Sequence, residues 1–314
     1  MRVGVIFPGQ GSQTVGMGVD AARAYPAARS CFATARTVLG YDLLALCESG
    51  PEEKLRETRY AQPAIFVTNV ALALAVGELL SPVVSAGHSF GEYCSLTLAG
   101  ALTFETALAL VNERGLAMQR AADRAQGAMA AVLGLGPEAL RDAVAQAVAR
   151  GAGRVQLANF NAPGQIVISG DVAAVRLAGE LALEAGAKRI IPLNVAGAWH
   201  SELMDPAREE FTPHVESSTV MYPRFTVISN VDATPYDDVE RIKKNLIRSV
   251  TDEVRWHETA VAMAGFGLDL IVEFGASAVL APMMKRIEGA PKAIAVSDAA
   301  GVEKLRAQLA PAAV

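Results

Sequence analysis

The sequence predicts an α/β protein in which a large domain with a parallel sheet carries a small inserted domain. Short apolar runs alternate with helix-like segments over most of the 314 residues, and a β-α-β-β-α-β succession interrupts them at 127–196. Apolar residues make up 52% of the chain and charged residues 19%. This composition supports a sizeable buried core and excludes global disorder.

The large domain is expected over residues 1–126 and 197–314. Its strands are predicted where apolar runs lie between turn signals, at 2–7, 82–86, 225–229 and 268–273. Its first helices are predicted over much of 18–80, with breaks near Gly40 and Pro51, and further helices at 90–99 and 104–124.

The inserted domain, residues 127–196, is expected to be ferredoxin-like. Its strands are predicted at 129–135, 155–159, 165–169 and 189–195. Its helices are predicted at 137–150, which begins with a proline, and at 172–186, which ends at a glycine.

Charge and cysteine content exclude several classes of function. The net charge is −5 and no Lys/Arg-rich run is present, so nucleic acid is not an expected partner. The three cysteines lack CxxC spacing, which argues against a disulfide framework or a zinc site and favours a reducing cytoplasm. The apolar stretch 64–76 contains Thr68 and Asn69, so we expect a core helix and not a membrane span.

The pentapeptide Gly-His-Ser-Phe-Gly at 87–91 is a candidate nucleophile turn. An apolar strand precedes it and a helix follows, as in the sharp turn of α/β-hydrolase-like proteins. Such a turn exposes a serine hydroxyl and requires small neighbours, because strand and helix nearly touch. Ser89 is therefore the candidate nucleophile.

A serine nucleophile needs a base, and the chain has four histidines. His200 follows the last strand of the inserted domain, on a loop that could deliver it to the sheet edge. From spacing alone, a packed loop histidine is an equally good interpretation. His88 is expected to point away from its neighbour Ser89, and His214 and His257 are expected on the solvated surface.

Acyl chemistry also needs donors for an oxyanion. The backbone amide of Phe90, directly after the serine, is the first candidate. Gln10 lies in a Gly-Gln-Gly turn after the first strand, where glycines allow close backbone approach. The same turn could suggest a dinucleotide site, but Thr14 replaces the third glycine of that fingerprint.

Several motifs along the chain together resemble the malonyl-CoA:acyl-carrier-protein transacylase family, which includes free-standing acyltransferases that serve polyketide synthases. In order, the motifs are FPGQGSQ (7–13), QPAIFVTN (62–69), GHSFGEY (87–93), RGLAMQ (114–119), NAPGQIVISG (161–170), HSELM (200–204), ISNVDA (228–233) and VRW (254–256). This succession covers nearly the whole chain and is far more specific than the pentapeptide.

The resemblance implies a ping-pong transfer of malonyl from malonyl-CoA to an acyl carrier protein. Ser89 would be acylated, His200 would be the general base, and the amides of Gln10 and Phe90 would form the oxyanion hole. Arg114 would hold the malonyl carboxylate, although alone it could be a solvated helix residue. Met118, in the same motif, would contact the substrate. Neither metal nor redox cofactor is expected.

Four positions depart from the family pattern. Ser249, which the resemblance places among the substrate-binding residues, replaces a glutamine whose backbone carbonyl would orient His200. Glu253 replaces a proline. Trp199 stands where malonyl-selective members carry phenylalanine, and Phe90 where an aliphatic residue is common. We expect these two rings to fill the space that the α-methyl branch of methylmalonyl would need.

Contacts with the carrier protein or CoA are expected from basic and amide side chains. The basic candidates are Lys188, Arg189, Lys285 and Arg286, for which a solvating role is an alternative. Asn161 is a further candidate for this contact. For Asn159, Asn161 and Gln165 the favoured alternative is that they satisfy turn backbone.

Three further functions are compatible with parts of this pattern. A free-standing polyketide-synthase acyltransferase would use the same chemistry as the transacylase of fatty-acid synthesis. A serine esterase or thioesterase would share the nucleophile turn but would not need Arg114. A non-enzymatic carrier-protein binder would leave Ser89 without a role.

Overall fold

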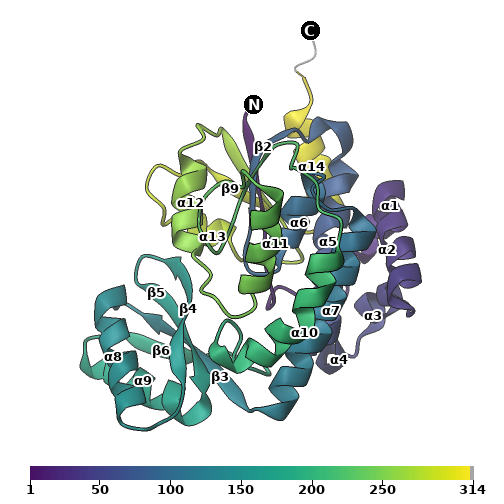
Figure 1. The fold of residues 1–314 in the computed structure, drawn as a ribbon. Coiled ribbons are helices and arrows are strands. Elements are labelled where there is room, and N and C mark those ends of the chain that lie inside the picture. The colour runs from purple at the N-terminus through teal and green to yellow at the C-terminus, as the bar shows by residue number, and fades with distance from the viewer. Residues whose placement is uncertain (312–314) are drawn as a thin grey trace.

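The computed structural model describes residues 1–311, which contain two separate sheets (Figure 1). The larger sheet has five strands in the order β7-β2-β1-β8-β9, and every neighbouring pair is parallel, as predicted. Its strands are β1 (Val3–Phe7), β2 (Pro82–Gly87), β7 (Thr226–Ile228), β8 (Leu270–Phe274) and β9 (Ala293–Val296). β9 was not predicted, because it has only four residues, three of them half-buried, and it pairs with β8 at the sheet edge.

Helices cover both faces of this sheet. The N-terminal group is α1 (Val19–Ala24), α2 (Pro26–Leu39), α3 (Leu43–Ser49), α4 (Glu52–Arg56), α5 (Thr58–Val76), α6 (Gly91–Leu98) and α7 (Phe104–Arg124). The C-terminal group is α10 (Asp205–Ser217), α11 (Val239–Arg248), α12 (Trp256–Ala264), α13 (Ala281–Met284) and α14 (Ala299–Leu309). Short 3₁₀ turns lie at η1 (Gly77–Leu79) and η2 (Glu202–Met204). The predicted breaks are confirmed: Gly40 ends α2 at φ 76° and Pro51 precedes α4.

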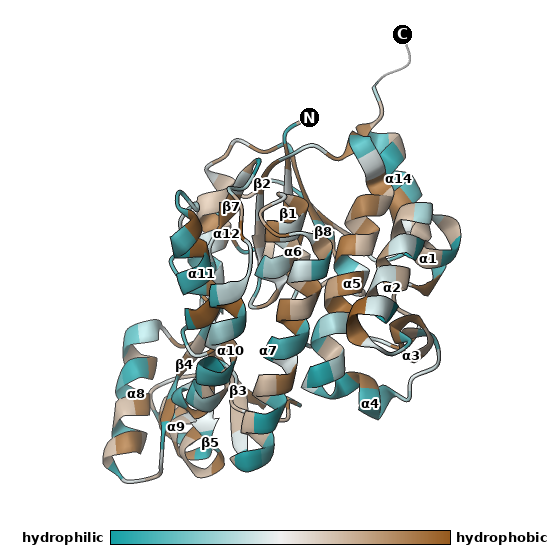
Figure 2. Cartoon of the chain, turned by 45° about the vertical axis from the view of Figure 1, so that its right-hand side comes forward, coloured by the Kyte–Doolittle hydropathy of each residue, from teal (hydrophilic) through white to brown (hydrophobic). Residues whose placement is uncertain are grey.

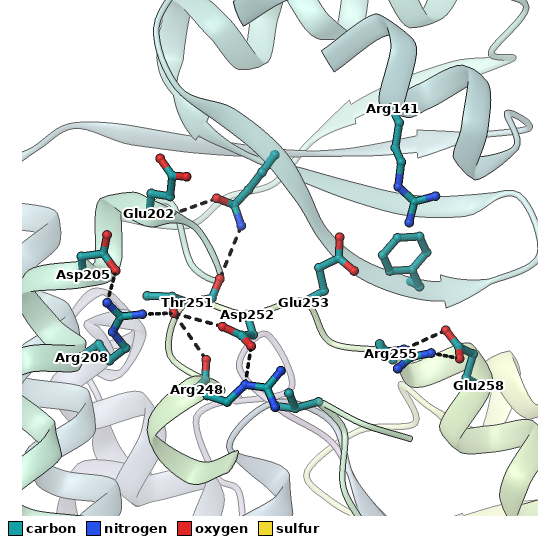
Figure 3. A pocket seen from close by; sticks show the side chains of 13 residues that line it. Arg141, Glu202, Asp205, Arg208, Arg248, Thr251, Asp252, Glu253, Arg255 and Glu258 are labelled. Atoms are coloured by element: carbon teal, nitrogen blue, oxygen red, sulfur yellow. Dashed lines mark hydrogen bonds and ion pairs between the residues drawn. The ribbon is translucent and has the colours of Figure 1, made fainter. Parts of the chain in front are cut away.

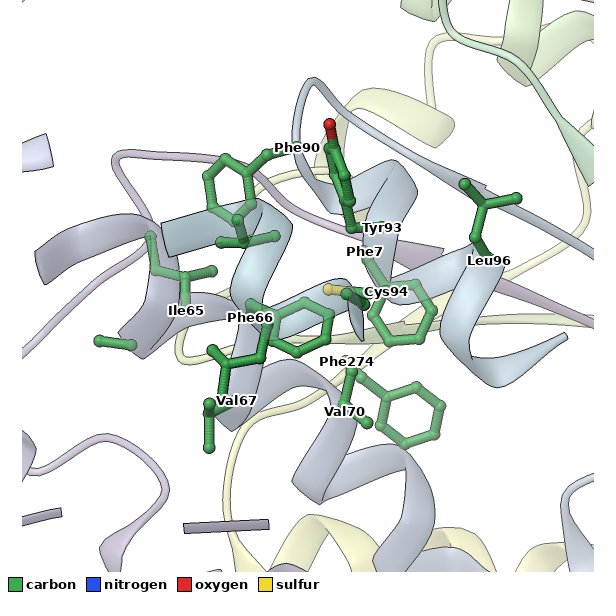
Figure 4. Packing of buried hydrophobic residues seen from close by; sticks show 14 of the residues in the cluster. Phe7, Ile65, Phe66, Val67, Val70, Phe90, Tyr93, Cys94, Leu96 and Phe274 are labelled. Carbon is green, nitrogen blue, oxygen red and sulfur yellow. The ribbon is translucent and has the colours of Figure 1, made fainter. Parts of the chain in front are cut away.

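The alternation of side chains along β1 divides the core into two layers. Val5 and Phe7 face the layer that contains α5, whereas Ile6 faces the layer beneath Trp256. Phe7 stacks near Phe274, and residues of α5 and α6 complete the cluster (Figure 4).

The helix α5 is the apolar stretch that the sequence predicted as a core helix. By length and composition, Thr58–Leu79 could cross a membrane, but 83% of its most apolar window is buried inside the protein. It packs against α2, α6 and α7, and most of its residues are apolar (Figure 2). This burial is typical of a core helix.

The smaller sheet is antiparallel, with the order β4-β5-β3-β6. Its elements are β3 (Gly127–Leu133), α8 (Pro137–Ala149), β4 (Val155–Ala162), β5 (Gln165–Asp171), α9 (Val172–Glu184) and β6 (Arg189–Pro192). The helices α8 and α9 supply its separate core. β6 is shorter than expected, because the amide of Val195 bonds to the carbonyl of Leu193 and the chain turns away from β3.

The two sheets are joined through β4. The amide of Phe160 donates to the carbonyl of Val254 at 2.9 Å, and the amide of Val254 donates to the carbonyl of Ala158 at 2.8 Å. A segment of the large domain is thereby hydrogen-bonded to the edge of the small sheet, and the candidate site lies between them.

Candidate active site

Ser89 lies on a turn so tight that its flanking positions accept only glycine. A Cβ at Gly87 would lie 1.9 Å from the backbone carbon of Gly91, and a Cβ at Gly91 would lie 2.4 Å from the carbonyl oxygen of Phe7. Ser89 itself has φ 54°, in the left-handed region that non-glycine residues seldom adopt. The turn therefore holds the serine between β2 and α6 at a cost in backbone strain.

The His200 ring lies next to this serine. Its Nε2 is 2.8 Å from Ser89 Oγ, and its Nδ1 is 3.1 Å from the carbonyl oxygen of Asp252. A carbonyl can only accept, so Nδ1 carries the proton and Nε2 is free to accept from the serine hydroxyl. His200 is 3% exposed, and its backbone also has a left-handed φ of 57°.

The carbonyl oxygen of Asp252 accepts the hydrogen bond from His200 Nδ1. The carbonyl of Ser249, the expected orienting group, also acts on the ring from the same segment. Ser249 follows the last residue of α11, and its Oγ donates back to the carbonyl of Leu246 at 2.8 Å. Its side chain does not line the cavity, so the expected contact of Ser249 with substrate is wrong.

Burial determines the protonation state of His200. Removal from water, with the Arg114 guanidinium and His88 nearby, lowers the pKa of His200 to about 3, and the carbonyls of Asp252 and Ser249 only partly oppose this shift. The imidazole is consequently neutral near neutral pH, which is the form that can accept a proton.

Arg114 is buried in the same place, and the interpretation as a solvated helix residue is wrong. Only 1% of it is exposed. Its Nη1 donates to Gln62 Oε1 at 3.0 Å and its Nη2 to Ser89 Oγ at 3.3 Å. Within residues 1–311 no carboxylate lies within 4.0 Å of this guanidinium, and its Nε has no acceptor. A buried cation without a counter-ion favours an anionic ligand.

Two backbone amides near the serine are available to an oxyanion. Across the described residues, neither the amide of Gln10 nor that of Phe90 donates to any acceptor. The side chain of Gln10 donates to Thr58 Oγ1 at 3.1 Å, and Asn69 Nδ2 donates to the carbonyl of Pro8 at 3.2 Å. These contacts fix the loop after β1 beside the nucleophile turn.

These groups line a cavity of about 280 Å³ between the two sheets. The sequence-predicted residues that line it are Gln10, Ser89, Phe90, Arg114, Met118, Asn159, Asn161, Gln165, Trp199 and His200. Most of the lining is apolar, so charge at its centre comes mainly from Arg114. The Nε1 of Trp199 finds no hydrogen-bond partner within residues 1–311, and its ring forms part of the wall.

Among the described residues, the other histidines do not hydrogen-bond to Ser89 or His200 through their side chains. His88 points to Asn161, with Nε2 and Oδ1 2.9 Å apart, so the expectation that Asn161 satisfies turn backbone is wrong. His214 lies on α10, 3.9 Å from Glu113, and is exposed as expected. His257 is half-buried on α12, so its expected position on the solvated surface is wrong.

The four basic candidates gather near one end of the small sheet. Leu133 pairs with both Gln165 and Arg189, which places Lys188 and Arg189 at the end of the sheet that carries Gln165. Arg286 donates to Gln165 Oε1 at 2.8 Å and to the carbonyl of Pro163. Lys285 is its exposed neighbour. Since Gln165 lines the cavity, Arg286 contacts the cavity wall, and we refer to Lys188, Arg189, Lys285 and Arg286 as the rim cluster.

Sequence reasoning assigned no role to a polar network behind the serine. The amide of Ser89 donates to Asn230 Oδ1 at 3.1 Å, and Asn230 donates from its backbone and side chain to Glu92. Tyr236 donates to the other oxygen of this carboxylate. Glu92 and Asn230 both lie in motifs that carried the resemblance, but only the tertiary structure shows that they touch. Burial raises the pKa of Glu92 to about 7.

Comparison with known proteins defines the class. The acyl transferase domain family matches residues 5–307, and the chain belongs to that family. It is an acyltransferase.

Similar proteins indicate a more specific kind of acyltransferase. The chain is 42% identical to the malonyl CoA-acyl carrier protein transacylase of Haemophilus influenzae, over 95% of this chain and 96% of that protein. An acyl carrier protein S-malonyltransferase from Vibrio cholerae matches with TM-score 0.92 and 41% identity, covering 97% of this chain and all of that one. A structure described as a type II polyketide-synthase acyl-carrier protein in complex with its malonyl-transacylase matches with TM-score 0.93 and 39% identity, covering 98% and 100%.

Proposed function

We propose that the protein transfers the malonyl group of malonyl-CoA to the phosphopantetheine thiol of an acyl carrier protein. Arg114 carries this proposal, because a buried guanidinium without a carboxylate partner lies 3.3 Å from the hydroxyl of the candidate nucleophile. The free carboxylate of a malonyl group would supply the missing counter-ion. A bidentate guanidinium–carboxylate pair is both strong and directional.

The first half-reaction acylates Ser89. His200 Nε2 takes the hydroxyl proton while Oγ attacks the thioester carbon. The negative charge moves to the carbonyl oxygen, where the free amides of Gln10 and Phe90 can stabilise it. As this intermediate collapses, the carbon–sulfur bond breaks and the imidazolium protonates the CoA sulfur. A malonyl-serine ester remains.

The second half-reaction reverses these steps with a new thiol. The phosphopantetheine thiol gives its proton to His200 Nε2, and its sulfur attacks the ester carbon. The carbon–Oγ bond breaks, and Oγ recovers the proton from the imidazolium. Every proton passes through one nitrogen, and the Asp252 carbonyl keeps that nitrogen aimed at Ser89 in both halves. These steps require neither a metal nor a redox cofactor.

The rim cluster supports the assignment of a carrier partner. Lys188, Arg189, Lys285 and Arg286 would meet the acidic carrier protein or the CoA phosphates. The protein is expected to work in the cytoplasm, where malonyl-CoA is present and its three buried free cysteines stay reduced.

Fatty-acid synthesis is the proposed pathway, and polyketide synthesis is the second candidate. The second candidate is favoured by the similarity to the transacylase bound to a type II polyketide-synthase carrier protein. An esterase or thioesterase is disfavoured, because it would leave the Arg114 cation buried without purpose.

Intact-mass spectrometry after mixing with malonyl-CoA tests the proposal. The wild type should gain one malonyl group, and Ser89→Ala none. Arg114→Ala should lose malonyl loading by roughly 100-fold or more and accept acetyl in its place when acetyl-CoA is supplied. Malonyl loading of Arg114→Ala at the wild-type rate would refute the role of Arg114.

A further inference from the structure

A second cleft, of about 690 Å³, lies between α8 and β4 of the inserted domain and the η2–α12 part of the large domain, and it is lined mainly by charged side chains (Figure 3). Most of its cations are paired: Arg248 contacts Asp252, Arg255 contacts Glu258, and Arg208 contacts Asp205. This internal pairing leaves little free charge for a ligand. One uncharged side chain of the wall, Gln156 on β4, makes contacts of a different kind.

Gln156 hydrogen-bonds to backbone groups of two distant segments. Its Nε2 lies 3.3 Å from the carbonyl oxygen of His200 and 3.4 Å from that of Thr251, and it donates to both. Its Oε1 accepts from the amide of Glu202 at 3.0 Å. In the sequence, His200, Glu202 and Thr251 lie 44, 46 and 95 residues after Gln156.

These two segments are the ones that place the base. The first carries His200, whose left-handed backbone conformation is unfavourable for a side chain with a Cβ. The second carries the Asp252 carbonyl that accepts from His200 Nδ1, one residue after Thr251. The single side-chain amide of Gln156 thus binds the backbone of His200 and the Thr251 carbonyl. The Thr251 carbonyl adjoins Asp252, whose own carbonyl accepts from His200.

Other contacts nearby leave this task to Gln156. The Ser249 hydroxyl is used within α11. Arg248 binds the Asp252 carboxylate, which fixes the side chain of Asp252 but does not touch the His200 segment. Among the described residues, Gln156 is the side chain that hydrogen-bonds to both segments.

We propose that Gln156 is a positioning residue for His200, which ties the His200 segment and the Thr251–Asp252 segment together from the inserted domain. This inference rests on the proposed function, since it assumes that His200 is the base. Gln156 lines the polar cleft and not the catalytic cavity, so it acts through His200 and does not touch the substrate.

Rapid-quench mass spectrometry of malonyl-serine formation tests this role. Gln156→Met keeps the length of the side chain and removes all three hydrogen bonds. Gln156→Glu keeps the shape and the acceptor for Glu202 but loses both donors. In both variants the burst rate should fall on the order of tenfold, with unchanged burst amplitude and little change in KM for malonyl-CoA. Gln146→Met, on the exposed face of α8, is the matched control and should keep the wild-type rate.

The amplitude separates positioning from folding. A purely structural role would lower the amplitude, which counts competent molecules, and leave the rate of each molecule unchanged; that result, or a rate within twofold of wild type, would overturn the inference. His200→Ala provides the benchmark for the proposed function. If His200→Ala keeps the wild-type burst rate, the base assignment fails; if it loses the burst while both Gln156 variants keep the wild-type rate, only the role of Gln156 fails.

Discussion

Ser89 and His200 are both held in left-handed backbone conformations, but different parts of the molecule hold them. The strain at Ser89 comes mainly from steric contacts at one turn, because Gly87 and Gly91 let β2 and α6 touch, while β1 and Asn230 pack against that turn. The conformation of His200 is supported by groups far along the chain, among them Gln156 and Asp252.

This difference predicts how the Ser89 turn and the position of His200 should each respond to mutation. A nucleophile turn built mainly from close steric contacts should lose its structure abruptly when an atom is added. A base held by several hydrogen bonds from elsewhere loosens gradually when one of them is lost. The predictions below test this contrast from the largest expected effect to the smallest.

Gly87→Ala should disrupt the nucleophile turn. The added Cβ would lie 1.9 Å from Gly91, and backbone on both sides prevents relief. We expect a loss of more than about 4 kcal/mol of stability, and at least about 100-fold in kcat/KM for any folded fraction. Gly136→Ala is the control, because Gly136 has φ −75° and open space around its Cβ position. Denaturant titration and steady-state assays measure both, and equal behaviour of the two variants would contradict the steric account.

Replacement of Trp199, the residue before His200, should alter the selectivity between malonyl-CoA and methylmalonyl-CoA. Trp199 adjoins His200 and lines the cavity, so wild type should prefer malonyl-CoA over methylmalonyl-CoA. Trp199→Ser should shift the ratio of the two kcat/KM values toward methylmalonyl-CoA by about tenfold. Each enzyme serves as its own control, since both substrates are measured on one preparation. A wild-type ratio near one would refute the prediction.

The pH dependence of stability should separate the groups behind the two residues. Because the pKa of Glu92 is raised to about 7 in the folded protein, the folded state holds an extra proton between the ordinary carboxyl value and pH 7, and stability falls as pH rises through this window. Because the pKa of His200 is lowered to about 3, stability falls as pH drops from the ordinary imidazole value toward 3.

Calorimetry on two variants checks these opposite signs. The Tm of Glu92→Gln, relative to wild type, should rise by a few °C from about pH 5 to about pH 8. The Tm of His200→Ala, relative to wild type, should instead rise as pH falls over about pH 6.5 to about pH 4. A pH-independent difference for either variant would show that the group does not titrate as its burial requires.

Charge reversal at the rim should have the smallest effect. Arg286→Glu should raise KM for the carrier protein by about three- to tenfold at low salt, with a smaller effect at high salt, because rim charges act mainly on encounter. Arg150→Glu is the control, since Arg150 precedes β4 at the opposite end of the small sheet. An equal rise in both variants would assign the effect to net charge and not to the rim.

Much of this arrangement follows from local sequence. The strand before Gly87, the small residues around Ser89 and the helix after it are specified within a few positions, so the nucleophile could be predicted. The β-α-β-β-α-β succession likewise predicted the small sheet. Spacing alone left the base open, because nothing near His200 specifies that its ring meets Ser89, and the family resemblance was needed to select it.

The sequence by itself determined the parallel sheet, the inserted ferredoxin-like unit and the serine turn, because these depend on periodicity and on steric demands between neighbouring residues. Only the tertiary structure decided that the Asp252 carbonyl accepts from His200 Nδ1 and that Glu92 and Asn230 support the serine backbone. It also decided that Arg114 is buried with no counter-ion among residues 1–311. These features depend on which backbone groups meet after residues far apart in the chain pack together, and no local pattern encodes that geometry.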